Sequence, residues 1–300
     1  MRLVFFGTPE EGAVVLEALV GAGLDVVLVV TRPDKRRARR GQPEPSPVRI
    51  AADRLGLQVR TPEKAAEVAD ELRNSGATLG VVVAYGQILP LSVLEALPLG
   101  LVNLHFSLLP RWRGAAPVER AILAGDAETG VCLMRLEEGL DTGAVFACVR
   151  TPILDDETAG ELRARLVDLG VDLVVTTLPE TVTTVPEPQQ GEPTYADKLD
   201  VGEFHLDPSR PADELHRIVR AGNPRPGAWM HVGGRRLKVL RATCEPGTGD
   251  APGTIDEEAR LATVDGVLVL EEMQPEGGRV MSGSEWRRGL SRPDVSVDEP

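Results

Sequence analysis

Four short, mainly apolar runs separated by helix-like segments constrain the fold of this chain most strongly. They cover residues 3–6, 26–30, 79–84 and 100–105. Such apolar runs are typical of strands buried on both faces of a parallel sheet. The intervening segments carry apolar residues at helical spacing, as at Val15 and Leu19. The sequence therefore predicts an α/β fold with a parallel sheet and right-handed crossovers.

The second half of the chain begins in the same pattern and then changes character. A strand is expected at residues 144–150 and a helix at 159–178. Residues 182–195 hold several prolines and a pair of glutamines, a composition typical of a linker. Beyond residue 205, a helix at 211–220 precedes short β-like runs punctuated by Gly and Pro. We expect a small all-β barrel or sandwich in this region.

The charge balance excludes a protein that is uniformly basic over its surface. Lys and Arg number 33 and Asp and Glu 46, a net charge of −13. Any polyanionic partner must therefore meet local basic patches. One candidate patch is residues 32–41, with six basic residues and one acidic residue; the other is residues 205–241, with eight and three. A merely solvated loop is the alternative interpretation of the first patch.

The three cysteines, Cys132, Cys148 and Cys244, are an odd set without a CxxC pair. This spacing argues against a disulfide framework and against a thiolate zinc site. We therefore predict free cysteines and a cytoplasmic protein. The first residues lack the features of a signal peptide, and no apolar run approaches the ~18 residues that span a bilayer.

Asn103 and His105 are the strongest candidates for a chemical role. They are two residues apart at the end of an apolar strand, so their side chains point to the same side. Open α/β sheets bind ligands beyond the carboxyl ends of their strands. An amide and an imidazole are suited to stabilising an oxyanion at an acyl carbon. A hydrogen-bonded structural histidine is the alternative.

Asp141 is the candidate partner of His105. It lies between Gly139 and Gly143, and a Gly-rich turn can present a carboxylate sharply. Such a carboxylate would fix the tautomer of the imidazole and favour its charged form. A simple turn-forming role for Asp141 is the alternative.

Rival chemistries have weaker signals. Ser107 follows His105 closely, but no GxSxG elbow surrounds it. The four histidines form no HxxxH pair, so we predict no metal. Gly7-Thr8-Pro9 lacks the GxGxxG and GxxxxGK[ST] patterns and is interpreted as a structural turn.

Ten segments spread over nearly the whole chain resemble the folate-dependent formyltransferase superfamily. They are residues 6–9 (FGTP), 32–34 (RPD), 45–48 (PSPV), 83–86 (VAYG), 102–105 (VNLH), 107–117 (SLLPRWRGAAP), 125–130 (GDAETG), 139–143 (GLDTG), 194–199 (TYADKL) and 223–229 (NPRPGAW). The Asn-x-His with a downstream Asp marks the superfamily. The SLLPRWRGAAP segment is similar to the branch that acts on the initiator tRNA.

The resemblance implies a Rossmann-like formyltransferase domain at residues 1–185, a linker at 186–204 and an OB-like tRNA-binding domain at 205–300. It implies transfer of formyl from 10-formyltetrahydrofolate to the α-amine of initiator methionyl-tRNA, without a metal or membrane and by a monomer. The implied catalytic residues are Asn103, His105 and Asp141. The implied folate-binding residues are Tyr85, Gly86, Gln87, Ile88, Leu89, Ser107, Leu108, Leu109 and Pro110. The implied tRNA-binding residues are Arg36, Arg37, Arg39, Arg40, Arg235, Arg236 and Lys238.

Two other functions remain open from the sequence. A folate-dependent enzyme acting on an amino sugar or another small amine would share Asn103, His105 and Asp141, but would not need the basic loop or the barrel. A non-catalytic relative that binds tRNA or folate would not need the three catalytic residues.

Overall fold

The computed structural model describes residues 1–36, 42–247, 250–290 and 295–298, which form two compact units. The first unit comprises Met1–Gly114, Thr129–Thr151 and Ala164–Tyr195. The second comprises Ala115–Glu128, Pro152–Arg163 and Ala196–Pro300. The chain thus passes between the units several times. The boundaries expected from the sequence, at residues 185 and 205, stay a prediction.

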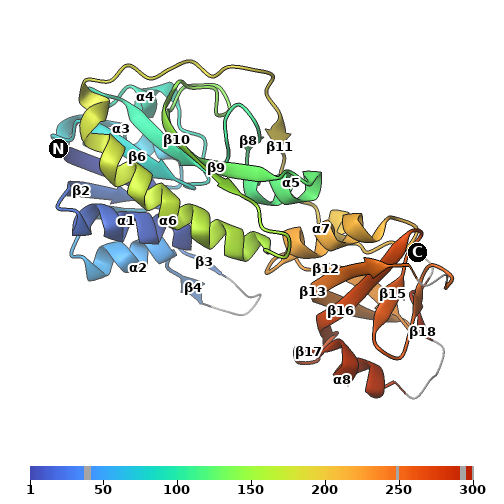
Figure 1. Cartoon of the computed structure of the whole chain (residues 1–300). Helices are drawn as coiled ribbons and strands as arrows, with labels where there is room; N and C mark the ends of the chain where they lie inside the picture. The colour runs from blue at the N-terminus through green and yellow to red at the C-terminus, as the bar shows by residue number, and fades with distance from the viewer. Residues whose placement is uncertain (37–41, 248–249, 291–294, 299–300) are drawn as a thin grey trace. The chain divides into compact units, whose positions relative to one another are not determined.

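A mixed, mostly parallel sheet forms the centre of the first unit (Figure 1). Its order is β10-β9-β7-β6-β1-β2-β5. The strands are β1 (Arg2–Gly7), β2 (Asp25–Val30), β5 (Val59–Arg60), β6 (Leu79–Val83), β7 (Leu101–His105), β9 (Glu128–Arg135) and β10 (Val145–Pro152). β1 pairs in parallel with β2 and β6, and β6 with β7, which confirms the predicted α/β sheet. β7 pairs with β9 in antiparallel fashion, which the sequence did not predict.

Short helices accompany this sheet. They are α1 (Glu10–Gly21), α2 (Pro47–Arg54), η1 (Ala65–Val68), α3 (Ala69–Asn74), α4 (Leu91–Leu94), α6 (Ala159–Thr177) and η2 (Leu178–Val182). α2 begins where it does because the Ser46 hydroxyl accepts the backbone N–H of Arg49. Two short strand pairs complete the unit: β3 (Lys35–Arg36) with β4 (Pro43–Glu44), and β8 (Arg113–Gly114) with β11 (Tyr195–Ala196).

Burial of both strand faces explains why the apolar runs were such strong signals. Leu3, Val4, Phe5 and Phe6 of β1 are all 0% exposed. Val4 and Phe6 belong to a cluster with η1, α3 and α4, and the alternate residues face the opposite side of the sheet. Burying side chains of this size stabilises a fold by ~1.5–3 kcal/mol each. Among the described helices, none is long and apolar enough to cross a membrane.

A curled antiparallel sheet dominates the second unit and confirms the predicted OB-like fold. It is built from β12 (Ala228–Val232), β13 (Arg235–Pro246), β14 (Thr254–Ile255), β15 (Arg260–Ala262), β16 (Gly266–Pro275), β17 (Met281–Ser282) and β18 (Val295–Ser296). Its helices are α5 (Pro117–Ala124), η3 (Val201–Phe204), α7 (Ala212–Gly222) and α8 (Gly283–Arg288). The apolar face of α7, with Leu215 and Ile218 almost fully buried, packs against β13 and β16.

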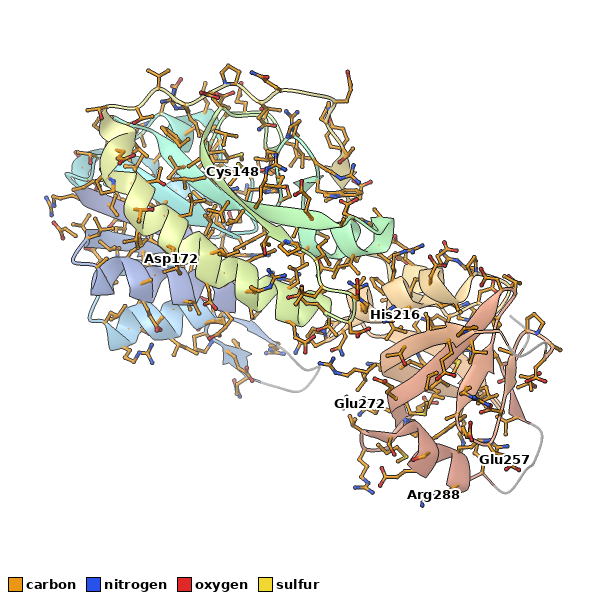
Figure 2. The ribbon with its side chains drawn as sticks, in the orientation of Figure 1. Cys148, Asp172, His216, Glu257, Glu272 and Arg288 are labelled. Atoms are coloured by element: carbon orange, nitrogen blue, oxygen red, sulfur yellow. A yellow bond between two sulfur atoms is a disulfide. The ribbon has the colours of Figure 1, made fainter. Side chains whose placement is uncertain are left out.

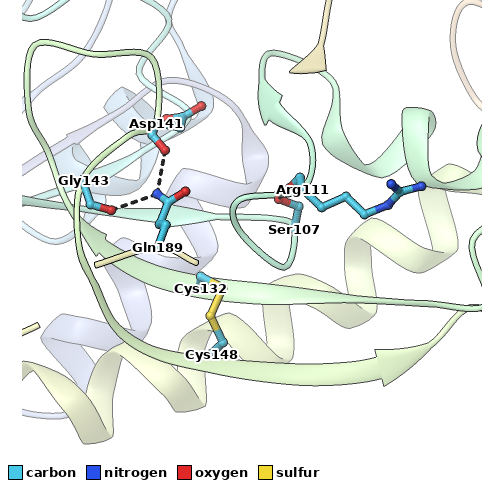
Figure 3. Close-up of a disulfide and its surroundings, with 7 residues drawn as sticks. All are labelled: Ser107, Arg111, Cys132, Asp141, Gly143, Cys148 and Gln189. Atoms are coloured by element: carbon cyan, nitrogen blue, oxygen red, sulfur yellow. Dashed lines mark hydrogen bonds between the residues drawn. A yellow bond between two sulfur atoms is a disulfide. The ribbon is translucent and has the colours of Figure 1, made fainter. Parts of the chain in front are cut away.

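The prediction of free cysteines is wrong for two of the three. Cys132 on β9 and Cys148 on β10 form a disulfide (Figures 2 and 3). The two cysteines meet because β9 and β10 are neighbours in the sheet. The spacing of cysteines along the sequence does not show which strands are neighbours. Cys132 also lies directly opposite His105 in the β7–β9 register. The disulfide closes a loop that contains Asp141.

Candidate active site

A cavity of about 330 Å³ lies in the first unit beside the carboxyl ends of β6 and β7. One wall is formed by residues 84–89, and another by residues 136–141. Asn103 and Asp141 both line it. Most of the other lining side chains are apolar, and Ile88 and Leu140 are 93% and 59% exposed. The cavity therefore combines a few polar side chains with mostly apolar walls, a combination typical of small-molecule sites.

His105 is almost completely buried at the end of β7, with 5% of its side chain exposed. Its Nε2 lies 2.9 Å from the carbonyl oxygen of Trp112. Because a carbonyl oxygen only accepts, Nε2 must carry the proton of this hydrogen bond. Nδ1 is then the nitrogen that faces Asp141, with 3.7 Å between Nδ1 and Oδ2. The structure thus brings together the two residues that the sequence proposed as partners.

The carboxylate of Asp141 is held from two directions. Oδ2 accepts the backbone N–H of Gly114 at 2.8 Å and faces the His105 ring. The backbone of Asp141 has a φ of 49°, in the left-handed region that non-glycine residues seldom adopt. The expectation of a sharp turn between Gly139 and Gly143 is therefore met at Asp141 itself. A position of this kind needs surrounding contacts to hold it.

Asn103 reaches the cavity from the same strand as His105. Its side chain is half-buried, and β7 places it two residues before the histidine. In the part of the chain that the structure describes, no hydrogen bond occupies its side-chain amide. The amide N–H groups of Asn103 are therefore available to a molecule in the cavity.

Residues 85–89, predicted to bind folate, all line the cavity. The side chain of Gln87 holds this segment in place, accepting the N–H of Ala65 and donating to the carbonyl oxygen of Pro62. Tyr85 is 2% exposed, and burial raises the pKa of its hydroxyl to about 12. Among the described residues, its hydroxyl oxygen has no hydrogen-bond partner. Tyr85 is thus neutral at ordinary pH.

The second predicted folate segment, Ser107, Leu108, Leu109 and Pro110, is not among the residues that line this cavity. Ser107 is fully buried, and its hydroxyl donates to the carbonyl oxygen of Arg111 at 2.6 Å (Figure 3). This bond closes the turn that precedes Trp112 and gives Ser107 a structural role. Contact between these four residues and folate stays a prediction.

The residues that connect the catalytic candidates were not predicted from the sequence. Trp112 and Gly114 supply the backbone groups that contact His105 and Asp141. Gln189 donates to the carbonyl oxygens of Asp141 and Gly143 (Figure 3). The sequence signal available for it was the pair of glutamines in a proline-rich segment, which composition alone assigned to a linker.

The basic residues fall into two groups. Arg37, Arg39 and Arg40 lie outside the residues that the structure describes, while Arg36 is exposed on β3. Arg235, Arg236 and Lys238 lie on β13 in the second unit. The β12–β13 register places Arg236 opposite His231 and Lys238 opposite Trp229. These four side chains share one face of the sheet, because residues directly opposite each other in an antiparallel pair point to the same side.

This surface, which we call the β12–β13 face, is defined by Trp229, His231, Arg236 and Lys238. The Arg236 guanidinium lies 4.3 Å from the Trp229 ring centroid, and the His231 ring lies 5.2 Å from it. The ring of His205 packs against Trp229 at 4.6 Å, and burial lowers the pKa of His205. Stacked rings beside cationic groups are typical of surfaces that contact nucleic acid.

Metal ligation has no structural support in the described part of the chain. Within those residues, no three His, Cys, Asp or Glu side chains gather as a metal ion would require. The carboxylate nearest His105 is instead occupied by a backbone N–H.

Two family models together match nearly the whole chain. Residues 1–178 match the model described as formyl transferase, and residues 198–291 match formyl transferase, C-terminal domain. The chain is 46% identical over 297 residues to the methionyl-tRNA formyltransferase of Paracoccus denitrificans, covering 98% of this chain and 99% of the relative. It is also 46% identical over 295 residues to the enzyme of that name from Thermus thermophilus, covering 96% of each.

Solved structures show the same fold at low sequence identity. The N-formyltransferase from Helicobacter canadensis, solved with folinic acid and dTDP-3-aminofucose, has a TM-score of 0.68 and 18% identity. That comparison covers 90% of this chain and 99% of the other. HypX from Aquifex aeolicus, solved with tetrahydrofolic acid, has a TM-score of 0.66 and 18% identity over 95% of this chain. This chain spans 46% of the length of HypX.

Proposed function

This chain belongs to the formyl transferase family, and we propose that it transfers the formyl group of 10-formyltetrahydrofolate to the α-amine of methionyl-tRNA. The observation that carries the proposal is that Asn103 and Asp141 line a cavity of about 330 Å³ and that Asp141 also faces the buried His105 ring. The near-full-length similarity to methionyl-tRNA formyltransferases supports this amine substrate over others.

The proposed reaction is an acyl transfer. The uncharged α-amine attacks the formyl carbon, and a tetrahedral oxyanion forms. The bond between that carbon and N10 of the folate then breaks, and the proton lost by the amine replaces the formyl group on N10. No redox change occurs, and the formyl carbon is already electrophilic.

Asn103 and His105 are the proposed donors to the oxyanion. The Asn103 amide faces the cavity and has N–H groups to spare. In its protonated form, His105 keeps Nε2–H on the Trp112 carbonyl and presents Nδ1–H toward Asp141 and the reacting oxygen. Donors fixed before the reaction stabilise the developing charge without reorganisation. Asp141 is proposed to orient the His105 ring and to accept the amine proton through water.

The cavity suits the pterin end of a folate. Its volume lies in the usual range for small-molecule sites, and apolar side chains from both walls would cover the faces of a flat ring. Tyr85 packs in the apolar core against Phe6, so it would support this wall of the site rather than bind the ligand through its hydroxyl. We propose residues 85–89 as the principal folate-binding segment.

The tRNA is proposed to contact the β12–β13 face together with Arg235 and the basic loop at residues 36–40. Arg236 and Lys238 are without ion-pair partners among the described residues, whereas Arg120, Arg163 and Arg241 of the same unit are all paired with carboxylates. Unpaired cations beside a stacked Trp229 are suited to phosphate and base contacts. This function places the protein in the cytoplasm, where translation occurs.

The test is formylation of charged initiator tRNA by the purified protein with 10-formyltetrahydrofolate as the donor. We expect N-formylmethionyl-tRNA to form, and uncharged tRNA to remain unmodified. A dTDP-amino sugar and a free amino acid serve as competing amines. Formylation of the amino sugar with no formylation of methionyl-tRNA would overturn the proposal and favour the small-amine alternative.

A further inference from the structure

The side chain of Gln189 contacts two segments: the loop that carries Asp141 (Figure 3) and residues 112–114. Its Nε2 donates to the carbonyl oxygens of Asp141 at 2.7 Å and Gly143 at 2.8 Å. Its Oε1 accepts from Nε of Arg113 at 3.0 Å and from a terminal nitrogen of Arg113 at 2.7 Å. One amide therefore connects two segments that are far apart in the sequence.

These four hydrogen bonds use the full capacity of the amide group. A glutamine has two N–H donors and one oxygen with two lone pairs, and each is engaged here. The partners also fix its orientation. If the amide were flipped, its N–H groups would meet the N–H groups of Arg113, and its oxygen would meet the two carbonyl oxygens.

The segment that Gln189 holds through Arg113 makes both backbone contacts to the proposed catalytic pair. Trp112 precedes Arg113 and accepts the proton of His105 Nε2 at 2.9 Å. Gly114 follows Arg113 and donates its N–H to Asp141 at 2.8 Å. A displacement of Arg113 would therefore move the groups that orient His105 and Asp141 together.

The backbone around Gln189 is itself attached to the first unit on both sides. Glu187 forms a reciprocal backbone pair with Val145, at 2.8 and 2.9 Å. Thr194 accepts the backbone N–H of Trp112 on its hydroxyl and that of Arg113 on its carbonyl, each at 2.9 Å. These anchors fix where the Gln189 amide lies.

We propose that Gln189 is a positioning residue that sets the relation between His105 and Asp141. This inference rests on the proposed function, because it assumes that this pair acts on the formyl transfer. Gln189 reaches no reacting atom; it acts by holding the left-handed turn at Asp141 and the Trp112–Gly114 segment in one arrangement. A small misplacement of reacting groups costs on the order of 10²-fold in rate.

Two substitutions separate the two halves of the contact. Gln189→Glu keeps an acceptor for Arg113 but replaces the NH2 group, which carries both donors, with one carboxylate oxygen that faces the Asp141 and Gly143 carbonyls. Gln189→Ala removes both halves without adding a charge. Gln190 is the matched control, because it is adjacent, exposed and without a hydrogen bond in the described structure. Gln190→Glu adds the same charge one residue away.

We would measure kcat and both KM values with methionyl-tRNA and the formyl donor, and the unfolding midpoint of each variant. Both Gln189 variants should lose on the order of 10²-fold in kcat, with KM values little changed. Gln190→Glu should behave as the wild type. The decrease in kcat should persist at temperatures where thermal unfolding shows the variants fully folded.

Three results would contradict this role. The first is wild-type kcat in both Gln189 variants, and the second is an equal decrease in Gln190→Glu. The third is a decrease in kcat that disappears once it is corrected for the folded fraction. His105→Ala, measured in parallel, distinguishes the levels: full activity in that variant would overturn the proposed catalytic pair, whereas its loss with an active Gln189→Ala would overturn this inference alone.

Discussion

The site around His105 and the β12–β13 face differ in how their polar groups are held. His105 is almost fully buried, and its surroundings come from β7, from residues 112–114 and from the Asp141 loop. The β12–β13 face is only half-buried, and its residues come from two adjacent strands in regular register. The first site depends on contacts between segments that are distant in the sequence. The second depends only on the alternation of side chains along two paired strands.

This difference predicts two kinds of response to substitution. In the buried site His105, Asp141 and Gln189 are hydrogen-bonded to defined partners, so removing one of these groups misplaces the others and the effects should not be additive. On the β12–β13 face, Arg236 and Lys238 would contact a tRNA mainly through their charges. Their effects should therefore be smaller, roughly additive and sensitive to salt.

The largest effect is expected from the proposed oxyanion donors. Asn103→Ala and His105→Ala should each lower kcat by ~10²–10³, because each removes one donor to the developing charge. Steady-state formylation kinetics would measure this. Gln190→Ala is the control, since Gln190 is exposed and has no hydrogen bond in the described structure, and Ser107→Ala is measured beside it to test the rival chemistry. Loss of activity only in Ser107→Ala would instead favour a serine nucleophile.

The second prediction for the buried site concerns the disulfide beside it. It joins Cys132 and Cys148, which are 16 residues apart, around the loop that carries Asp141. Closing a loop of about this length stabilises a protein by ~3 kcal/mol in the chain-entropy model. Cys132→Ser with Cys148→Ser should lower the free energy of unfolding by about this amount, measured by urea titration.

Cys244→Ser is the matched control for the disulfide, because Cys244 is a free cysteine of the second unit. It should leave stability close to that of the wild type. The double variant should retain much of its kcat, since Gln189 and Gly114 still hold the Asp141 loop. An equal free energy of unfolding for the wild type and the double variant under oxidising conditions would show that the disulfide does not stabilise this loop.

A smaller effect is expected from substitutions on the β12–β13 face. Arg236→Ala with Lys238→Ala should raise KM for methionyl-tRNA roughly tenfold and lower the slope of log K against log salt by ~0.7–0.9 for each phosphate that the protein no longer neutralises. KM for the formyl donor should not change. Arg54→Ala with Arg73→Ala removes the same charge from two ion-paired surface sites of the first unit. An equal response of the two double variants would mean that only net charge matters.

The sequence predicted the parts of this molecule that depend on local pattern. The apolar runs predicted the parallel strands, and the strand-end position of Asn103 and His105 predicted that they share a side. The Gly-flanked turn predicted a sharply presented Asp141, and the structure places it beside His105. In each case a short stretch of chain carried the physical cause, either burial of both faces or access to a left-handed backbone.

The parts that the sequence did not predict depend on contacts between distant segments. Gln189 lies 48 residues from Asp141 and 76 from Arg113, in a proline-rich segment without periodicity. The disulfide depends on which strands are neighbours at the sheet edge, which cysteine spacing does not reveal. The antiparallel β9 likewise follows from how the chain returns to β7. Such features need the tertiary arrangement.

The smallest effect is expected from Tyr85, whose hydroxyl is buried at the cavity of the first unit. Burial raises its pKa to about 12, so the folded protein resists deprotonation of this group while the unfolded chain deprotonates near pH 10. The stabilising effect is therefore complete below pH 10 and is lost as the pH rises toward 12. The hydroxyl is neutral in both states at pH 7, so its effect on stability changes with pH only above about pH 10. In Tyr85→Phe, stability between pH 10 and 12 should fall less steeply than in the wild type, while at pH 7 the two should be nearly equal. Thermal unfolding across this pH series would measure the difference. If stability depended on pH in the same way in the two proteins, the hydroxyl would be solvated in the folded state. Tyr85 would then not belong to the buried polar groups of this comparison.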